Sequence, residues 1–388
     1  MDALSSNRAG DFFDGWKRRI NAVNVQPSPC IRQLIYAAYE AAHLIERLPQ
    51  PESEVAGCVL WTLLPDFSLC LDMQNHCVYL AAKSEQILDD LQSMLDVATR
   101  YPATVSPSTG VLPEIQVTDQ TIYKRNVQTV RDYIAAGDVF QANIARFWTM
   151  PCAKVDLTAL YGRLRAVNAA PFSCFVRVET NRDTLHIQSA SPERLFRINT
   201  DGIVDTRPIA GTRRRGTGDM DEKLRAEMLL SDKERAEHIM LVDLERNDLG
   251  RVCVPGSVEV NETMTVEAYA TVQHIVSNVR GRLRDNIDLV DVFRAMFPGG
   301  TITGCPKVRC MQIIHELEGQ ARGPYTGGVG FLAWDGSADM NILIRTFWHH
   351  QGRLHWAAGA GIVADSDAEF ELCETGHKAE GLMRALAK

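Results

Sequence analysis

Residues 327–364 read GGVGFLAWDGSADMNILIRTFWHHQGRLHWAAGAGIVA, and this stretch decides the fold class. It predicts three successive strands, because its apolar runs are short and are separated by turn-forming residues. The strands are expected at 327–334, 339–348 and 354–364. Strands that follow one another this closely form hairpins, since a parallel pair would need a long crossover between them. A final helix is predicted at 367–387.

Outward from this stretch, the chain groups its strands in hairpins and its helices in blocks. That grouping predicts an α+β fold of layered, mostly antiparallel sheets flanked by helices, rather than a doubly wound sheet. The further strands are expected at 138–149, 172–178, 184–190, 202–207 and 271–282. The further helices are expected at 155–169, 219–249, 287–296 and 306–318.

The N-terminal part predicts a smaller region of mixed structure, residues 1–113. Apolar residues at helical spacing predict a helix over 28–48, which the prolines of Leu48-Pro49-Gln50-Pro51 end. Three antiparallel strands at 55–63, 67–73 and 77–83, a helix at 84–100 and a linker at 102–113 are expected next. A capped helix from Thr118 to Ala136 begins the second region, 118–388, and we expect the two regions to form one intertwined fold.

Composition narrows the class of function. The chain has 388 residues, is 45% hydrophobic and 23% charged, and carries a net charge of -8 with a pI near 5.7. These values indicate a globular protein without a basic footprint for nucleic acid or an anionic membrane. Its ten cysteines include no C-x-x-C pair, which argues against zinc and disulfides and favours a reducing compartment. Without a secretory leader or a long apolar stretch, we expect a cytoplasmic protein that handles a small molecule.

Two pairs of glutamates have the same spacing. Glu234 and Glu237 lie three residues apart in a predicted helix, and Glu371 and Glu374 repeat this near the C-terminus, one turn before Lys378. Residues three apart share one helical face, so four carboxylates can converge from two helices. Oxygen ligands without histidine or cysteine favour Mg²⁺ over zinc. The alternative is a solvated helical face, which is the more common reason for a single such pair.

The segment FPGGTITGCPKVRCMQII, residues 297–314, places a loop rich in glycine and threonine before Pro306. Proline suits the first turn of a helix, and such a start presents free N–H groups to an anion. A carboxylate could bind there, near the hydroxyls of Thr301 and Thr303 and the charge of Lys307. A glycine turn that only begins a helix is the alternative. The G-x-x-x-x-G-K-[ST] pattern of nucleotide-binding loops is absent.

Three polar side chains stand within apolar strand sequences: Gln141, His274 and Arg345. A buried polar group without a partner is costly, so each must find one. A core histidine bonded to the backbone is the common case. An arginine between isoleucine and threonine needs a carboxylate, which either the protein or a substrate could supply.

Taken together, these segments resemble the chorismate-utilising enzymes, which include anthranilate synthase component I, aminodeoxychorismate synthase component I, and the isochorismate and salicylate synthases. The resemblance runs from about Tyr133 to the C-terminus, behind an N-terminal part that is shortened relative to the family. It implies layered antiparallel sheets with the active site in a cleft between them. Its motifs are SPERL (191–195), RPIAGTRRRG (207–216), KERAEHIMLVDLERNDLGRV (233–252), HIVSNVRG (274–281), FPGGTITGCPK (297–307), GPYTGGVG (323–330), ILIRT (342–346) and GAGIVADSDAEFELCET (359–375).

The resemblance implies a magnesium site and a substrate site. Glu237 and Glu374 are expected to bind Mg²⁺, with Glu234 and Glu371 holding metal-bound waters, and the ion is expected to meet the ring carboxylate of chorismate. Arg345 and Tyr325 resemble the residues that bind the enolpyruvyl carboxylate. The full set expected to bind the substrate is Tyr325, Arg345, Gly304, Gly359, Gly361 and Lys378.

It also implies two residues for proton transfer. Glu193 resembles the general acid that protonates the departing C4 hydroxyl, a poor leaving group. His274 resembles the histidine that takes part in acid–base chemistry during pyruvate elimination.

Three positions bear on the branch of the family. Isochorismate and salicylate synthases have a water-activating lysine where this chain has Gln141, which indicates ammonia as the nucleophile. Aminodeoxychorismate synthases typically have a nucleophilic lysine at the position of Ala210. Ala210 therefore resembles anthranilate synthase. Thr301 does too, since serine is common at that position in the aminodeoxychorismate synthases.

Other features favour aminodeoxychorismate synthase component I, and this is the branch predicted. They are the Gln141-x-Asn143-x-Ala145 strand, the ILIRT motif, and the lack of a Leu-Leu-Glu-Ser motif before residue 100. The predicted enzyme makes 4-amino-4-deoxychorismate for p-aminobenzoate and folate. Anthranilate synthase component I and an inactive chorismate-sensing subunit are the alternatives. Because no Cys-His glutaminase is evident, a glutamine amidotransferase partner is expected to supply ammonia.

Overall fold

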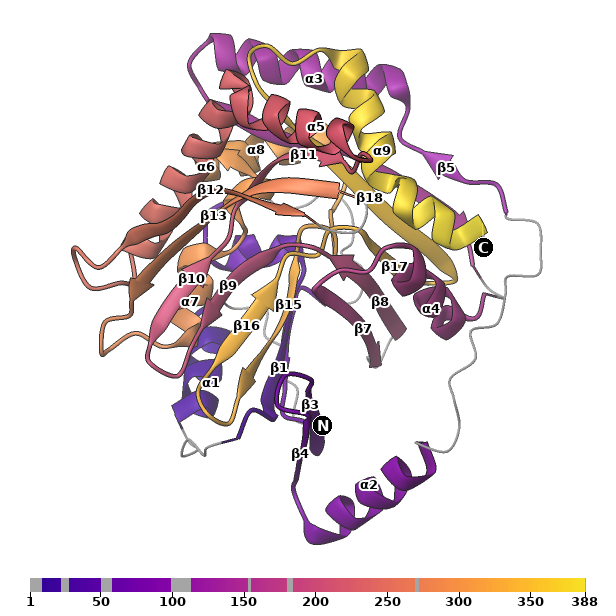
Figure 1. The fold of residues 1–388 in the computed structure, drawn as a ribbon, viewed down its shortest axis with the longest axis vertical. Helices are drawn as coiled ribbons and strands as arrows, with labels where there is room; N and C mark the ends of the chain where they lie inside the picture. The colour runs from indigo at the N-terminus through magenta and orange to yellow at the C-terminus, as the bar shows by residue number, and fades with distance from the viewer. Residues whose placement is uncertain are drawn as a thin grey trace.

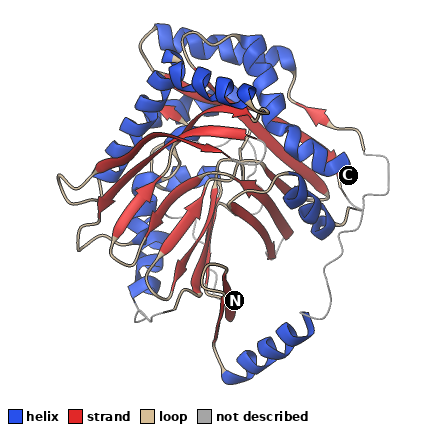
Figure 2. Ribbon diagram, viewed as in Figure 1, coloured by secondary structure: helices blue, strands red, loops and turns tan. Residues whose placement is uncertain are grey.

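The computed structural model describes residues 9–21, 28–49, 58–98, 113–152, 155–179, 184–268 and 272–387 (Figure 1). Two antiparallel sheets form the middle of the molecule, and most of the helices lie around them (Figure 2). This α+β architecture confirms the predicted fold class. The linker predicted at 102–113 lies almost wholly outside the described residues.

Within the described residues, nine strands form the larger sheet, and each pairing in it is antiparallel. The sheet joins segments that are far apart in the sequence, because β1 pairs with β15. The order is β11 (Ile209–Arg214), β13 (Val272–Arg282), β10 (Ile203–Thr206), β9 (Arg194–Ile198), β16 (Ala338–Asn341), β15 (Gly328–Ala333), β1 (Ile31–Ala37) and β2 (Leu60–Leu63), with β12 (Glu259–Ala268) also on β13.

A second sheet of seven described strands is antiparallel as well. Its order is β14 (Gly304–Cys305), β6 (Gln141–Pro151), β18 (Arg353–Ile362), β17 (Thr346–His350), β8 (Thr184–Ser191) and β7 (Phe172–Glu179), with β5 (Gln116–Val117) on β6. The hairpin of β3 (Phe67–Asp72) and β4 (Cys77–Ala82) stands apart from both sheets.

Helices cover these sheets. The N-terminal helix packs its aromatic residues on α7, where the rings of Trp16 and Phe293 lie 5.5 Å apart. In Figure 1, α2 projects from the body beside the β3–β4 hairpin. The helices are α1 (Ala9–Asn21), α2 (Glu85–Ala98), α3 (Gln120–Ala135), α4 (Leu157–Val167), α5 (Asp219–Leu230), α6 (Asp232–Gly250), α7 (Leu289–Met296), α8 (Lys307–Glu318) and α9 (Ala368–Ala387), with 3-10 turns η1 (Tyr39–Leu44) and η2 (Gly300–Ile302). None of the described helices is both long and apolar enough to cross a bilayer.

Three predictions about secondary structure were wrong. The strands expected at 55–63, 67–73 and 77–83 do not form one meander, because β2 pairs with β1 whereas β3 pairs with β4. The helix expected over 28–48 is strand β1 followed by η1. Most residues of β1 are buried, because Ile35 and Ala37 pack into one hydrophobic cluster and Tyr36 packs into another. A short apolar run of this kind resembles a buried helix in periodicity. The strand expected at 339–348 is two strands, since β16 belongs to the larger sheet and β17 to the smaller. Helix α1 and strands β9, β11 and β12 were not predicted.

Candidate active site

Two of the places where the chain crosses from one sheet to the other lie next to each other. Strand β8 of the smaller sheet leads into β9 of the larger through residues 192–193, and β16 returns to β17 through residues 342–345. The Ser191 hydroxyl donates to the carbonyl of Ile342 at 2.5 Å, and the N–H of Ile342 donates to the carbonyl of Glu193 at 3.1 Å. These bonds bring Glu193 and Arg345, which were predicted from separate motifs, into one place.

The Glu193 carboxyl is buried, with 6% of the residue exposed. The Thr301 hydroxyl, from turn η2, donates to its Oε1 at 2.6 Å. Burial raises the pKa of Glu193 to about 7, although Thr301, Lys378 and Arg345 all act to lower it. A carboxyl of this pKa is protonated in a large fraction of molecules at neutral pH, as a proton donor requires.

Arg345 lies at the second of these crossings, and its own backbone has a positive φ of 51°. The backbone there is held by the N–H of Ala190, which donates to the carbonyl of Arg345 at 3.1 Å. Burial lowers the pKa of the guanidinium, and Glu193 opposes this. Among the described residues, no side chain forms a hydrogen bond or an ion pair with this guanidinium. An anionic ligand would satisfy it.

His274 lies on β13 and is buried. Burial and, to a smaller extent, the charge of Arg345 lower its pKa to about 4, while a hydrogen bond with the Gly211 backbone acts in the opposite direction. The imidazole is therefore neutral at pH 7 and can accept a proton. Ala210 lies on the neighbouring strand β11, opposite Ile275, and is also buried.

Helix α6 carries the first glutamate pair. Ser231 caps it by accepting from the N–H of Glu234 at 3.3 Å. Glu237 accepts a hydrogen bond of 2.7 Å from the side-chain amide of Gln141, at the start of β6. The Glu234 carboxylate lies against β11, because a Cβ placed on Gly211 would stand 2.9 Å from its Oε2. Gln141 thus reaches one of the predicted metal ligands.

Helix α9 carries the second pair. Glu371 is buried and accepts from the Ser366 hydroxyl at 2.7 Å. Glu374 forms an ion pair of 2.7 Å with Lys378, whose ammonium also donates to the carbonyl of Gly359 at 3.0 Å. Lys378, which was expected to bind the substrate, is therefore joined to a predicted metal ligand in this structure.

Strand β18 lies between the two pairs. A Cβ on Gly361 would overlap the Gln141 amide and stand 3.4 Å from Glu237 Oε1, while the carbonyl of Gly359 accepts from Lys378. Within the described residues, no three metal-ligating side chains already form a cluster. Oxygen ligands from two helices nevertheless suit Mg²⁺, which usually takes one or two protein carboxylates and keeps waters and substrate oxygens.

The remaining predicted positions line the same strands. Tyr325 is buried, and a Cβ on Gly359 would stand 2.8 Å from its hydroxyl, so the tyrosine approaches β18 closely. Gly304 lies in β14 and allows close pairing with β6, since a Cβ there would overlap the carbonyl of Gln141. The roles assigned to these residues in substrate binding stay predictions.

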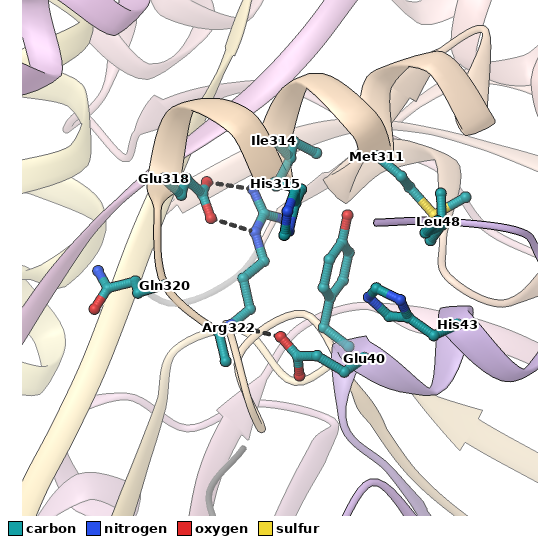
Figure 3. Close-up of a pocket in the computed structure, with 11 residues that line it drawn as sticks. Glu40, His43, Leu48, Met311, Ile314, His315, Glu318, Gln320 and Arg322 are labelled. Carbon is teal, nitrogen blue, oxygen red and sulfur yellow. Dashed lines mark hydrogen bonds and ion pairs between the residues drawn. The ribbon is translucent and has the colours of Figure 1, made fainter. Parts of the chain in front are cut away.

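Sequence reasoning missed the buried network that supports the site (Figure 3). The guanidinium of Arg322 donates to both oxygens of Glu318, at 2.8 and 2.6 Å, and to the carbonyls of Ile302 and Asn143. Glu40 accepts from the N–H of Arg322 at 2.7 Å. The network joins turn η2, strand β6 and turn η1, and the adjoining cavity, about 20 Å³, holds no more than a water. The signal available in the sequence was an arginine, Arg322, directly before Gly323 and Pro324.

A larger cavity of about 210 Å³ borders the crossing that carries Glu193. Pro192 and Ile209, which directly precede Glu193 and Ala210, line it together with Val276 and Phe172. Arg207 also lines it and is bonded to Glu262 at 2.9 Å and Glu267 at 2.5 Å.

Comparisons with known proteins identify the family of the chain. The model of the family described as chorismate binding enzyme matches residues 8–384. Anthranilate synthase component 1 1 of Haloarcula marismortui is 49% identical over 400 residues, covering 97% of this chain and 79% of that protein. Aminodeoxychorismate synthase component 1 of Bacillus subtilis is 46% identical over 266 residues, covering 68% of this chain and 55% of that protein.

The fold comparison gives the same result. The crystal structure of anthranilate synthase component I from Streptococcus pneumoniae superimposes with a TM-score of 0.84 and 29% identity, covering 98% of this chain and 86% of that one.

Proposed function

The chain belongs to the chorismate binding enzyme family, and from that premise we propose that it aminates chorismate with ammonia. The observation that carries the proposal is the buried Glu193, which has a pKa of about 7 and a hydrogen bond from Thr301. It lies near Arg345, which forms no ion pair with any of the described residues. A proton donor beside an anion-binding group suits the loss of hydroxide from a dicarboxylate substrate.

In the proposed reaction, ammonia forms a bond to a ring carbon of chorismate as the C4–O bond breaks. The proton of Glu193 goes to the departing oxygen, which leaves as water. Arg345 and Tyr325 bind the enolpyruvyl carboxylate, and Arg345 so orients the ring toward Glu193. Because the guanidinium is buried, its attraction to a carboxylate is stronger than it would be in water.

Mg²⁺ fits this arrangement as the cofactor. Glu237 and Glu374 would hold it, with Glu234 and Glu371 on its waters, and the bound ion would neutralise the ring carboxylate. Gln141 orients Glu237 through its 2.7 Å bond. Lys378 is paired with one oxygen of Glu374, and the other oxygen would be available to the ion.

We place the new C–N bond at C2, so that the products are anthranilate and pyruvate. Ala210 supports this, because an alanine at the position of the expected nucleophilic lysine cannot form a covalent bond to C2, which leaves that carbon open to ammonia. After amination, neutral His274 takes the C2 proton, and the C3–O bond breaks. The departing enolpyruvate then takes up a proton at its methylene carbon and becomes pyruvate. The two reported anthranilate synthases, one relative and one solved structure, support the same choice.

Amination at C4, giving 4-amino-4-deoxychorismate, is the second candidate and is the branch predicted from sequence. The Gln141-x-Asn143-x-Ala145 strand and ILIRT favour it, as does the similarity to the Bacillus subtilis enzyme.

Ammonia, rather than water, is the proposed nucleophile. Isochorismate and salicylate synthases use a lysine to activate water, and Gln141 takes that position here with its amide bonded to Glu237. A glutamine amidotransferase partner would supply the ammonia. Purified chain should therefore use free ammonium, and it should use glutamine only when that partner is added.

The decisive experiment incubates the pure chain with chorismate, ammonium and Mg²⁺, and identifies products by fluorescence and mass. Equal amounts of anthranilate and pyruvate are expected. 4-Amino-4-deoxychorismate as the main product would move the assignment to the second candidate, and no amination would overturn the proposal.

The Ala210→Lys variant extends this test, with Ala210→Met as the matched control of similar length. The lysine variant is expected to form a covalent adduct with chorismate, visible by intact mass, at the expense of anthranilate. The methionine variant should lose activity without an adduct. An adduct in neither variant would mean that position 210 does not face the ring.

A further inference from the structure

The guanidinium of Arg322 is buried and bonded on every side. Its side chain and that of its ion-pair partner Glu318 are each 1% exposed (Figure 3). Arginine has five N–H donors in a rigid, planar arrangement. Five hydrogen bonds of 2.6 to 3.3 Å leave this guanidinium, and their acceptors are both oxygens of Glu318, the carbonyls of Asn143 and Ile302, and the hydroxyl of Thr326.

These acceptors belong to four segments that are distant in the sequence: β6, turn η2, the end of α8 and the turn before β15. Two of them adjoin residues of the candidate active site. Ile302 directly follows Thr301, whose hydroxyl donates to Glu193 at 2.6 Å. Thr326 directly follows Tyr325. A rigid, planar group bonded to all four segments fixes their positions relative to one another.

The turn that carries Tyr325 needs such support. Thr326 has a φ of 60°, which a β-branched residue rarely adopts and keeps only where its surroundings hold it. Its hydroxyl accepts from Arg322 at 3.3 Å and donates to the carbonyl of Tyr325 at 2.6 Å. The guanidinium also lies over the ring of Tyr325, 5.5 Å from its centre. Arg322 therefore contacts both the backbone and the ring of this turn.

The backbone of Arg322 is fixed as well. Glu40, in turn η1, accepts from the N–H of Arg322 at 2.7 Å and from that of Gly323 at 3.0 Å. Glu318 holds the other end of the residue and also accepts from the N–H of Ala145 at 2.9 Å. The arginine is thus held at both ends before it reaches the segments of the site.

From this geometry we propose that Arg322, aligned by Glu318, is a positioning residue for the amination: it holds Thr301 against Glu193 and Tyr325 toward the substrate carboxylate. The inference rests on the proposed function, since it concerns the proton donor and the carboxylate site of that reaction.

Arg322→Lys is the variant that tests this role. Lysine keeps the positive charge, but its ammonium has three donors at one point and cannot reach acceptors on four segments. We expect η2 to shift and Thr301 to lose its bond to Glu193. That bond stabilises the ionised carboxylate, so its loss should move the alkaline limb of kcat to higher pH by roughly one unit. Displacement of Tyr325 should raise KM for chorismate by roughly tenfold.

A double variant shows whether the effect passes through Thr301. Thr301→Val removes the same hydroxyl directly and should move the same limb upward. Combined with Arg322→Lys it should move the limb no further, because the bond to Glu193 can be lost only once. The other charged groups that interact with Glu193 are the same in all of these variants: Arg345, Lys378 and Glu245.

Glu318→Asp provides a second route to the same result. It keeps the charge of the ion pair, but the shorter side chain cannot bond both Nε and Nη2 of Arg322 and still accept from Ala145. The limb should again move to higher pH. Arg163→Lys is the matched control, because it makes the same change at an arginine that is 8% exposed and donates to the carbonyl of Ala385 near the end of α9. It should leave the limb and KM unchanged.

Thermal melts first establish which variants are folded, and kcat and KM are then measured against pH. An unmoved limb in a folded Arg322→Lys or Glu318→Asp variant would reduce the pair to a packing role and overturn the inference. Shifts that add in the double variant would overturn it too, since Arg322 would then act independently of Thr301. Absence of amination in wild type would instead overturn the proposed function.

Discussion

Thr301 tunes the acidity of Glu193, because its hydroxyl donates to a carboxyl that is otherwise buried. A hydrogen bond of this kind stabilises the ionised form and lowers the pKa. Catalysis by Glu193 needs the protonated form, so activity is present below its pKa of about 7 and is lost as the pH rises through it.

Removing the hydroxyl should therefore move the alkaline limb of the kcat profile to higher pH. Thr301→Val is expected to shift it upward by roughly one pH unit, measured as kcat against pH. Thr301→Ser keeps the donor and serves as control, with a limb like that of wild type. A downward shift in the valine variant would show that another group sets the limb.

At the same scale, the structure added what local sequence could not predict. Ala210, His274, Glu193 and Arg345 were selected from separate motifs, and the two crossings place the last two together. The ion pair of Lys378 with Glu374 and the close approach of Glu245 to Gly300 were not predicted. They depend on how helices approach strands distant in sequence.

Among the elements, β18 links the two glutamate pairs. Its glycine at 361 leaves room for the Gln141 amide, which is bonded to Glu237 of α6. A methyl group at this position would displace the end of a flexible side chain rather than the backbone, so the fold should persist.

Gly361→Ala is therefore expected to weaken Mg²⁺ binding by about tenfold or more, as the loss of a partner that orients a metal ligand usually does. Calorimetric titration of Mg²⁺ in the presence of chorismate would measure this. Gly376→Ala, at an open position on α9, is the matched control. Equal affinity in both variants would argue against Glu237 as a ligand.

Sequence predicted elements best where capping residues mark their ends. Asp119 accepts from two N–H groups at the start of α3, as the capped run from Thr118 indicated. Prediction from sequence failed where tertiary contacts override the periodicity of apolar residues, as in β1. It also failed where the alternation of apolar and polar residues is weak, as in β9 and β11. Strand β1 has apolar residues on both faces because Ile35 packs into one hydrophobic cluster and Tyr36 packs into another.

At the scale of the whole molecule, α1 closes one side of the core. Trp16 is fully buried, packs on Phe293 and donates from its indole to Gln33 at 3.2 Å. No residue of the candidate active site is among these contacts.

Trp16→Ala should therefore lower the free energy of unfolding by about 3–5 kcal/mol, the usual cost of a large cavity, with little change in KM for chorismate. Denaturant titration would measure the loss. Phe67→Ala removes a half-exposed ring and should cost far less. A large rise in KM in the Trp16 variant would show that the core and the active site are coupled.

The pairing of β1 with β15 has a consequence for biosynthesis. The ribosome releases residues 31–37 early, yet their partner at 328–333 emerges only after almost three hundred further residues have been added. Strand β1 cannot pair with β15 until residues 328–333 have been synthesised, so its apolar side chains stay exposed until then. Such long-range pairing slows folding, so chaperones that hold nascent chains should bind this N-terminal segment.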